Sequence, residues 1–196
     1  MNPIIIAITD PALPSPQTWL QAALDLICRH PLPPPAPPRP TWIHLRARTL
    51  TPDDRLAAAL TLRAACRAAH LKLMLNADLD LALAADADGL HLPDGAPAPD
   101  RAALPRPLIL SRACHTPQAL AVAHREGFDL ATLSPVFPPR SKQPTHPALG
   151  LDALARACAA SPIPVIALGG LDTERADACL QAGAAGVAAI GWFFAP

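Results

Sequence analysis

Short apolar segments alternate with helical patterns along this chain, and the alternation limits the possible folds more than any other feature. Eight segments have the length and apolar character of strands: Ile4–Thr9, Thr41–Leu45, Leu71–Leu75, Gly89–Leu92, Leu108–Ser111, Leu130–Ser134, Val165–Leu168 and Gly186–Ile190. Six segments have helical periodicity: Pro16–Arg29, Pro52–Ala69, Asp78–Ala85, Pro117–Glu126, Leu151–Ala160 and Thr173–Ala182. Eight such units in 196 residues predict a compact (β/α)8 TIM barrel, as a single domain over residues 1–196. A doubly wound open sheet is the alternative.

The starts of the predicted helices carry typical capping residues. Thr51 precedes Pro52 and Thr116 precedes Pro117, which matches the preference for a hydroxyl cap followed by proline. Only residues 191–196 follow the last predicted strand, so we expect the last helix to be short or missing. We expect the aromatic side chains there to cap the barrel or to lie at a subunit contact, as in a homodimer.

Two segments interrupt the alternation. Residues 31–40 are rich in proline, which lacks the amide hydrogen that helices and central strands need, so we expect a stiff connector there. The loop Pro135–Pro147 follows the sixth strand and carries Ser141, Lys142 and His146. Loops of this length in a compact domain are usually functional or mobile, and we expect the same here.

The charge balance excludes some classes of partner. Lys plus Arg and Asp plus Glu number 16 each, so no net positive charge favours nucleic acid or an anionic membrane. The N-terminal apolar run is too short for a signal peptide, and no segment has the length of a membrane span. We therefore expect a cytoplasmic protein. The five cysteines are scattered, so we predict neither disulfides nor a structural zinc site.

The last two predicted strands both end in glycine. One ends in Gly169-Gly170 and the other in Gly191. Because glycine has no Cβ atom, a ligand can approach the backbone N–H groups closely. In many (β/α)8 barrels the ends of strands seven and eight hold a phosphate. The pattern therefore predicts that these two strands lie side by side and bind one oxyanion.

Basic side chains follow the second predicted strand, at the end where barrel enzymes carry their reactive groups. His44, Arg46 and Arg48 alternate along the chain and share one face of an extended segment. Arginine suits forked contacts with phosphate, so we predict an anionic ligand there, over which Lys142 closes. The alternative is a set of exposed rim charges paired with acidic neighbours. Further polar residues at strand ends are Asn76, Asp78, His91, Asp94, Ser111, His115 and Ser141.

His115 lies between the fifth predicted strand and the helix that follows. Imidazole titrates near neutral pH, so this placement predicts a general acid or base. The alternative is a histidine that caps the helix at Thr116. The sequence reveals no lowered pKa for the neighbouring Cys114, so we do not assign it as a nucleophile. A zinc site formed by His44, His91 and His115 has no support in their spacing.

These motifs recur in a fixed order along nearly the whole chain: Ile8-Thr9-Asp10, His44-Leu-Arg-Ala-Arg48, Leu75-Asn-Ala-Asp-Leu-Asp-Leu-Ala-Leu83, Ala87-Asp-Gly-Leu-His-Leu92, Ser111-x-x-x-His115, Leu133-Ser-Pro-Val-Phe-Pro138, Leu168-Gly-Gly-Leu171 and Ala182-Gly-Ala-Ala-Gly-Val187. Each motif is weak alone. In this order they resemble the thiamine phosphate synthase and TenI superfamily. The C-terminal half is similar to the synthase-like domain that some bacteria fuse behind a Nudix hydrolase.

The resemblance implies a phosphorylated small molecule as the ligand. The synthases of this family join a hydroxymethylpyrimidine diphosphate to a thiazole phosphate and release diphosphate. The resemblance implies that the thiazole phosphate is held by Gly169, Gly170, Ile190 and Gly191. It implies that the diphosphate side is formed by His44, Arg46, Arg48, Asn76, Ser141 and Lys142.

The chain departs from the family at the positions that bind magnesium. The resemblance places carboxylates where this chain has Ala77 and Ala96, and alanine offers no oxygen ligand. Asp78 and Asp94 stand one and two residues away, and Mg²⁺ would bind only if one of them replaced a lost carboxylate. We therefore expect no cofactor.

The loss of both carboxylates decides which member of the family we expect. TenI-like members are similar to a thiazole tautomerase, which moves a proton without a metal. We expect a TenI-like tautomerase in which His115 carries the proton and Arg46 holds the substrate carboxylate. The first alternative is a thiamine phosphate synthase, and the second is a non-catalytic barrel that binds a phosphorylated ligand.

Overall fold

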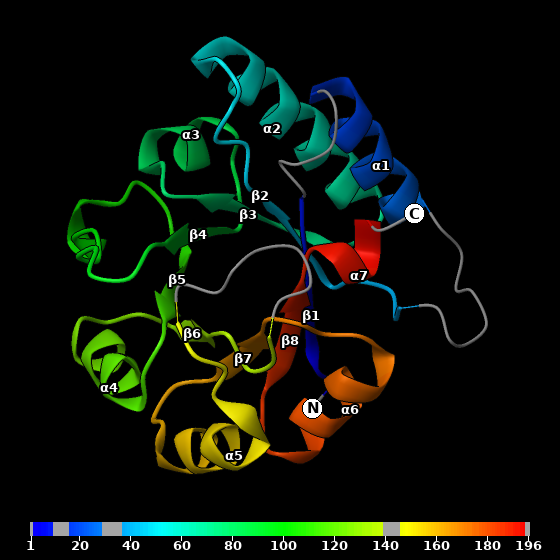
Figure 1. The fold of residues 1–196 in the computed structure, drawn as a ribbon. Helices are drawn as coiled ribbons and strands as arrows, with labels where there is room; N and C mark the ends of the chain where they lie inside the picture. The colour runs from blue at the N-terminus through cyan, green and yellow to red at the C-terminus, as the bar shows by residue number, and fades with distance from the viewer. Residues whose placement is uncertain (1, 10–15, 29–36, 139–145, 195–196) are drawn as a thin grey trace.

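The computed structural model describes residues 2–9, 16–28, 37–138 and 146–194. Within these ranges eight parallel strands close into a barrel in sequence order (Figure 1). The strands are β1 (Ile4–Ile8), β2 (Trp42–Leu45), β3 (Lys72–Asn76), β4 (Gly89–Leu92), β5 (Ile109–Cys114), β6 (Leu130–Leu133), β7 (Val165–Leu168) and β8 (Gly186–Ala189). The closed barrel confirms the predicted (β/α)8 fold and rules out the open sheet.

Helices surround the barrel and form its outer layer (Figure 1). They are α1 (Pro16–Cys28), α2 (Pro52–Ala68), α3 (Leu79–Ala84), α4 (Pro117–Arg125), α5 (Gly150–Ala160), α6 (Thr173–Gln181) and the single turn α7 (Gly191–Phe194). Thr51 and Thr116 accept hydrogen bonds from backbone amides of the first turns of α2 and α4, as predicted. Within the described ranges, none of the helices combines the length and apolar character that a membrane span requires.

Successive residues of the strands face two different apolar layers. Ile6 and Met74 belong to a cluster of strand residues that fills the barrel interior. Ile5 and Leu73 belong to a larger cluster that also includes helix residues such as Leu62, and that cluster forms the layer between strands and helices. Both faces of the strands are therefore buried, which explains their nearly continuous apolar sequence.

Strand β5 is longer than the sequence pattern predicts. It continues to Cys114, so Ser111 lies inside the strand and does not follow it. The apolar pattern used to predict the strand stops before Arg112, a charged residue whose exposed fraction is only 4%. The Arg112 guanidinium lies 2.6 Å from the carboxylate of Glu126 and 3.7 Å from that of Asp94. Burial of this charge is possible because it is paired.

The proline-rich connector lies partly outside the described residues. Its described part, residues 37–40, forms neither helix nor strand, as predicted. The Arg39 guanidinium donates a hydrogen bond to the carbonyl of Ala69 at the end of α2, with a distance of 3.0 Å. The end of the connector is thereby attached to the outer layer of the barrel.

The aromatic residues of α7 pack onto the barrel. Phe193 is buried in the layer between strands and helices, and its ring centroid lies 5.2 Å from that of Trp192. The helix α7 also contacts α1. Phe193 therefore packs between strands and helices, while the predicted cap over the barrel and the predicted homodimer stay predictions.

Candidate functional site

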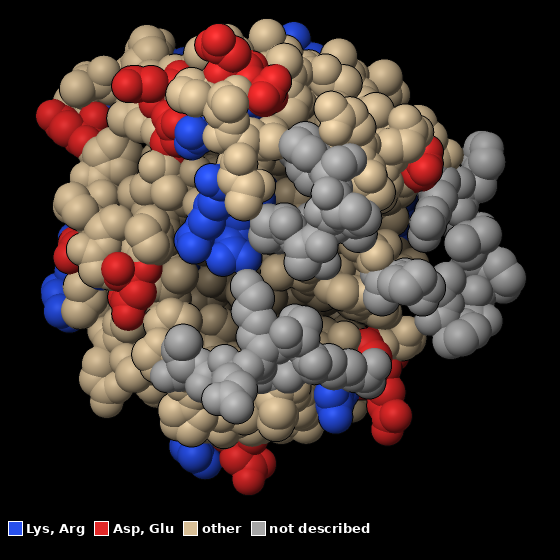
Figure 2. All heavy atoms as spheres, turned by 45° about the horizontal axis from the view of Figure 1, so that its top comes forward, with Lys and Arg blue, Asp and Glu red and all other residues tan. Residues whose placement is uncertain are grey.

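The carboxyl ends of the strands surround a cavity of about 290 Å³. Every strand, or the segment that follows it, contributes to the lining: Ile8, His44, Arg46, Arg48, Asn76, His91, Pro93, Asp94, Ala113, His115, Thr132, Ser134, Leu168 and Ile190. Figure 2 shows Lys and Arg atoms gathered beside a hollow near the centre of one face of the molecule. The barrel thus brings together most of the polar residues singled out in the sequence.

Arg46 and Arg48 line this cavity, although they lie beyond the end of β2 at Leu45. The prediction that His44, Arg46 and Arg48 lie on one extended strand is therefore wrong for the two arginines. All three side chains nevertheless line the same cavity. The Arg46 amide donates a hydrogen bond to the Thr9 hydroxyl, which ties this segment to the end of β1. None of the described residues forms an ion pair or hydrogen bond with the Arg48 guanidinium. The alternative of paired rim charges has no support at Arg48 in this part of the chain.

Two buried histidines form part of the cavity wall. The rings of His44 and His91 lie 4.9 Å apart, and His91 Nδ1 is 2.9 Å from the Ser111 hydroxyl. Burial lowers the pKa of His44 well below its ordinary value, and His91 and Arg46 lower it further. Burial, followed by the charges of Arg46 and Arg48, lowers the pKa of His91 to about 4. Both imidazoles are therefore neutral at pH 7.

Two buried polar atoms of the cavity have no hydrogen-bond partner among the described residues. They are Nε2 of His44 and the hydroxyl of Thr132, in residues that are 4% and 3% exposed. Buried polar groups are normally hydrogen-bonded, since leaving them unpaired costs free energy. Both atoms are therefore candidates for hydrogen bonds with a polar group of a ligand. The sequence analysis did not single out Thr132, because it reads as an ordinary strand residue.

His115 follows β5 directly and lines the cavity. Its Nδ1 lies 2.7 Å from the carbonyl oxygen of Ser134. A carbonyl only accepts hydrogen bonds, so Nδ1 carries the hydrogen and, in the neutral ring, Nε2 carries the lone pair. The ring stacks on that of His146, with centroids 4.1 Å apart. The tautomer is compatible with a general base, and the catalytic role of His115 stays a prediction. No role was predicted for His146.

The ends of β7 and β8 lie side by side, as predicted. Leu168 pairs with Ala188, and Leu168 and Ile190 both line the cavity. Gly191 begins the short helix α7, and no described atom lies within 4 Å of the position where its Cβ would stand. Among the described residues, no side chain or backbone atom therefore blocks this position.

Gly169 and Gly170 have a second, structural reason to be glycine. Their φ angles are +108° and +63°, a region that side chains rarely tolerate. A Cβ on Gly169 would lie 2.8 Å from Cα of Pro135, and one on Gly170 would lie 2.5 Å from the carbonyl oxygen of Pro138. The loop after β6 therefore packs directly on this glycine pair.

The carboxylates near the cavity are already engaged. Asp78 caps α3 by accepting a hydrogen bond from the Leu81 amide, and its other oxygen lies 3.5 Å from Arg55. Asp94 lines the cavity and pairs with Arg112. No group of three or more His, Cys, Asp or Glu side chains in the described ranges is arranged to hold a metal ion. This donor set does not fit a magnesium site with two carboxylates.

A second cavity of about 350 Å³ adjoins the first between the ends of β2 and β3 and the starts of α2 and α3. It shares Arg48 and Asn76 with the first, and it is lined further by Leu45, Ala47, Arg55, Leu75, Ala77, Asp78 and Leu81. The sequence analysis missed Arg55, because a charged residue in the first turn of a helix normally faces solvent. Arg48 therefore lies between two cavities.

Three other residues discussed from the sequence are Ser141, Lys142 and Cys114. Ser141 and Lys142 lie outside the described residues, so their part in the site stays a prediction. Cys114 is buried, and burial raises the pKa of its thiol to about 11. A thiol with so high a pKa is a poor nucleophile at neutral pH, in agreement with the sequence analysis.

The closed barrel and its cavity define a TIM-barrel protein with a cavity at the carboxyl ends of the strands, where proteins of this class bind their ligands. Comparison with known proteins identifies the group within that class. The family described as thiamine monophosphate synthase matches residues 5–193, and the chain belongs to this family. The resemblance inferred from the motifs is thereby confirmed.

Individual relatives carry the same description. Thiamine-phosphate synthase from Levilactobacillus brevis is 36% identical over 146 residues, which is 72% of this chain and 67% of that protein. Thiamine-phosphate synthase from Salinibacter ruber is 39% identical over 140 residues, which is 70% of this chain and 62% of that protein. The matched part thus spans about two thirds of the length of these relatives.

A solved structure shows the same fold. Thiamine phosphate pyrophosphorylase from Pyrococcus furiosus superposes with a TM-score of 0.78, covering 96% of this chain and 85% of that chain. The two sequences are 24% identical, so the likeness concerns the fold alone. The names of the two relatives favour the synthase, which was the first alternative, over the tautomerase that we expected.

Proposed function

We propose that this protein is a thiamine phosphate synthase, which joins a hydroxymethylpyrimidine diphosphate to a thiazole phosphate. The names of its relatives support the reaction. The observation that carries the proposal is that one cavity combines two kinds of wall. Arg46, Arg48 and Asn76 line one part, and Leu168 and Ile190, next to the glycine-rich ends of β7 and β8, line another.

The two walls suit the two phosphorylated substrates. We assign the thiazole phosphate to the backbone of Gly169, Gly170, Ile190 and Gly191, and the diphosphate to the arginine end. In the reaction, the thiazole nitrogen attacks the methylene carbon of the pyrimidine substrate, so that a C–N bond forms and the C–O bond to diphosphate breaks. The electron pair of the broken bond leaves with the diphosphate. Guanidinium groups beside the leaving group stabilise this growing negative charge.

The family implies a magnesium ion, and the described residues of this chain do not fit one. Ala77 and Ala96 replace the expected carboxylates, Asp94 is paired with Arg112, and Asp78 caps a helix. We therefore derive no step through a metal.

A second candidate function is the tautomerase-type proton transfer. His115 favours it, because the Ser134 carbonyl fixes its tautomer so that Nε2 can accept a proton. Proton exchange on the thiazole substrate, followed by NMR in deuterated water, tests this function. Exchange that His115→Ala abolishes would support the tautomerase, and absence of exchange in the unaltered protein would exclude it.

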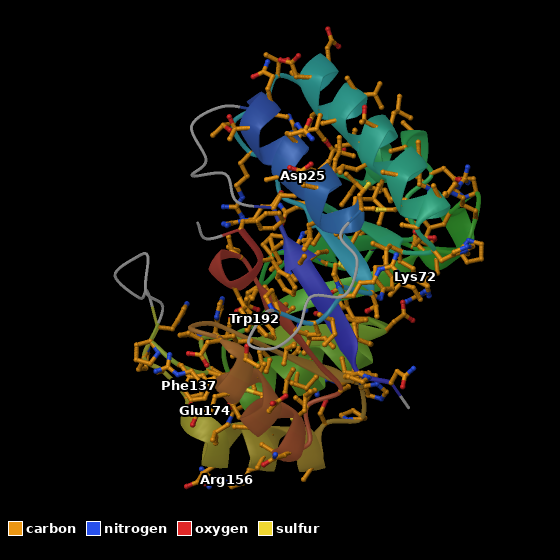
Figure 3. All side chains as sticks on the ribbon, turned by 90° about the vertical axis from the view of Figure 1, so that its right-hand side faces the viewer. Asp25, Lys72, Phe137, Arg156, Glu174 and Trp192 are labelled. Carbon is orange, nitrogen blue, oxygen red and sulfur yellow. The ribbon has the colours of Figure 1, made fainter. Side chains whose placement is uncertain are left out.

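Diphosphate release on addition of both substrates tests the synthase. We expect release in the unaltered protein and a loss of roughly 10- to 100-fold in Arg48→Ala, since a charge-assisted contact is removed. Arg156→Ala is the matched control, because Arg156 is exposed on α5 and points away from the barrel (Figure 3). Absence of diphosphate release, in a protein that binds both substrates, would contradict the proposal.

A further inference from the structure

The carboxylate that faces the main cavity lies beside a buried arginine. Asp94 lies 3.7 Å from the Arg112 guanidinium, whose side chain is 5% exposed and also binds Glu126. Asp78 faces the second cavity and pairs there with Arg55. Among the described residues, a divalent cation in the main cavity would therefore meet a single carboxylate, which is already paired.

The same end of the main cavity carries fixed positive charge. Arg46 and Arg48 line it, and a guanidinium stays protonated at any relevant pH. After burial, the charges of these two arginines are the next largest causes that lower the pKa of His91. Such an environment attracts an anion and repels a free divalent cation.

We propose that this end of the cavity binds diphosphate as the free anion, through Arg46, Arg48 and Asn76, without a divalent cation. The proposal rests on the proposed function, which makes diphosphate the leaving group. Guanidinium groups present several donors in a fixed fork and match phosphate oxygens closely. A cation on the diphosphate would add a positive charge beside two guanidinium groups, so magnesium is expected to weaken binding.

Alanine stands at position 77, where the family resemblance places a carboxylate, and this exchange affects the space next to Arg48. Ala77 lines the second cavity beside Arg48 and Asn76, so a longer side chain there would enter the space next to Arg48. The φ angle of Ala77 is +60°, where aspartate is better tolerated than alanine. The backbone therefore accepts Ala77→Asp without added strain, and this variant puts a negative charge beside the arginine.

Isothermal titration calorimetry with inorganic pyrophosphate tests the proposal. We expect binding in EDTA, and equal or weaker binding when excess MgCl₂ replaces EDTA. Arg48→Ala should weaken binding in EDTA at least tenfold, whereas Arg156→Ala should leave it unchanged. Ala77→Asp should weaken binding in EDTA and make binding respond favourably to magnesium. Circular dichroism confirms that each variant is folded.

Two results would overturn the proposal. The first is that pyrophosphate binds to the unaltered protein only when Mg²⁺ is present, or in neither buffer. The second is equal affinity of Arg48→Ala and the unaltered protein in EDTA.

The experiment separates this inference from the proposed function, because it needs no turnover. Pyrophosphate binding in EDTA without diphosphate release from the two substrates would sustain the anion site and contradict the synthase. Diphosphate release that requires magnesium, together with metal-dependent pyrophosphate binding, would sustain the synthase and contradict the metal-free site.

Discussion

Gly170 and Gly191 are both glycines at the ends of neighbouring strands, but the structure requires them to different degrees. A Cβ on Gly170 would meet the backbone of Pro138, and its φ of +63° disfavours a side chain. No atom of the described residues lies near the Cβ position of Gly191. Packing therefore requires glycine at position 170. At position 191 the described residues give no packing reason for glycine.

We predict that Gly170→Ala lowers the free energy of unfolding by roughly 2–4 kcal/mol, from backbone strain and overpacking together. Gly191→Ala should change it by less than about 1 kcal/mol, because the site is open and alanine favours the helical turn. Urea unfolding of the two variants measures both values. Equal destabilisation would show that the loop after β6 does not pack as described.

His44 and His91 make the stability of the fold depend on pH. Their pKa values are lowered in the folded protein, so the unfolded chain binds more protons and stability is lost as pH falls below about 6.5. For His91, whose pKa falls to about 4, the loss between pH 7.5 and pH 5 is roughly 2 kcal/mol. We predict that His91→Gln removes this part of the pH dependence in urea unfolding. A pH dependence identical to that of the unaltered protein would contradict the neutral, buried state of His91.

At the scale of the elements, the loop after β6 and the segment after β7 form one unit that Arg175 of α6 holds together. The Arg175 guanidinium donates a hydrogen bond of 2.8 Å to the carbonyl of Gly170 and lies 5.0 Å above the ring of Phe137. Figure 3 labels Phe137 on the loop after β6 and Glu174 in the first turn of α6. The unit borders the cavity near Leu168.

We predict that Arg175→Ala increases amide hydrogen exchange in residues 134–138 and 169–171, because the carbonyl and the aromatic ring both lose their partner. Arg156→Ala on α5 serves as the control and should leave these segments unchanged. Exchange rates that match in both variants would show that the contact does not stabilise the unit.

The strands and helices were largely predictable, because each carries its own periodicity and capping residues. The boundary of β5 was not, since Arg112 looks like a solvent-facing residue until Glu126 and Asp94 are seen beside it. The site was predictable where residues follow strands, as with Arg46 and His115. Contacts between distant segments, such as His115 with His146 or Gly170 with Pro138, carry no local signal and required the fold.

For the whole molecule, arginines at the two ends of the barrel can be compared by their ion-pair partners. Before β4, at the amino ends, Asp86 contacts Arg63, Arg67 and Arg106, so the arginines there are paired within the protein. At the carboxyl ends Arg48 has no described partner and faces a cavity. Other arginines at this end, Arg55 and Arg112, are paired with Asp78 and Asp94, so the contrast concerns Arg48. Barrels of this class carry their ligand sites at the carboxyl ends, which is where Arg48 lies.

A crystal structure of the protein grown in EDTA with thiazole phosphate and inorganic pyrophosphate tests the central claim most directly. The account predicts the thiazole phosphate within hydrogen-bond distance of the backbone of Gly170 and Gly191, and pyrophosphate against Arg46 and Arg48 in the same cavity. Either anion bound elsewhere, or pyrophosphate found there only after magnesium is added, would contradict it.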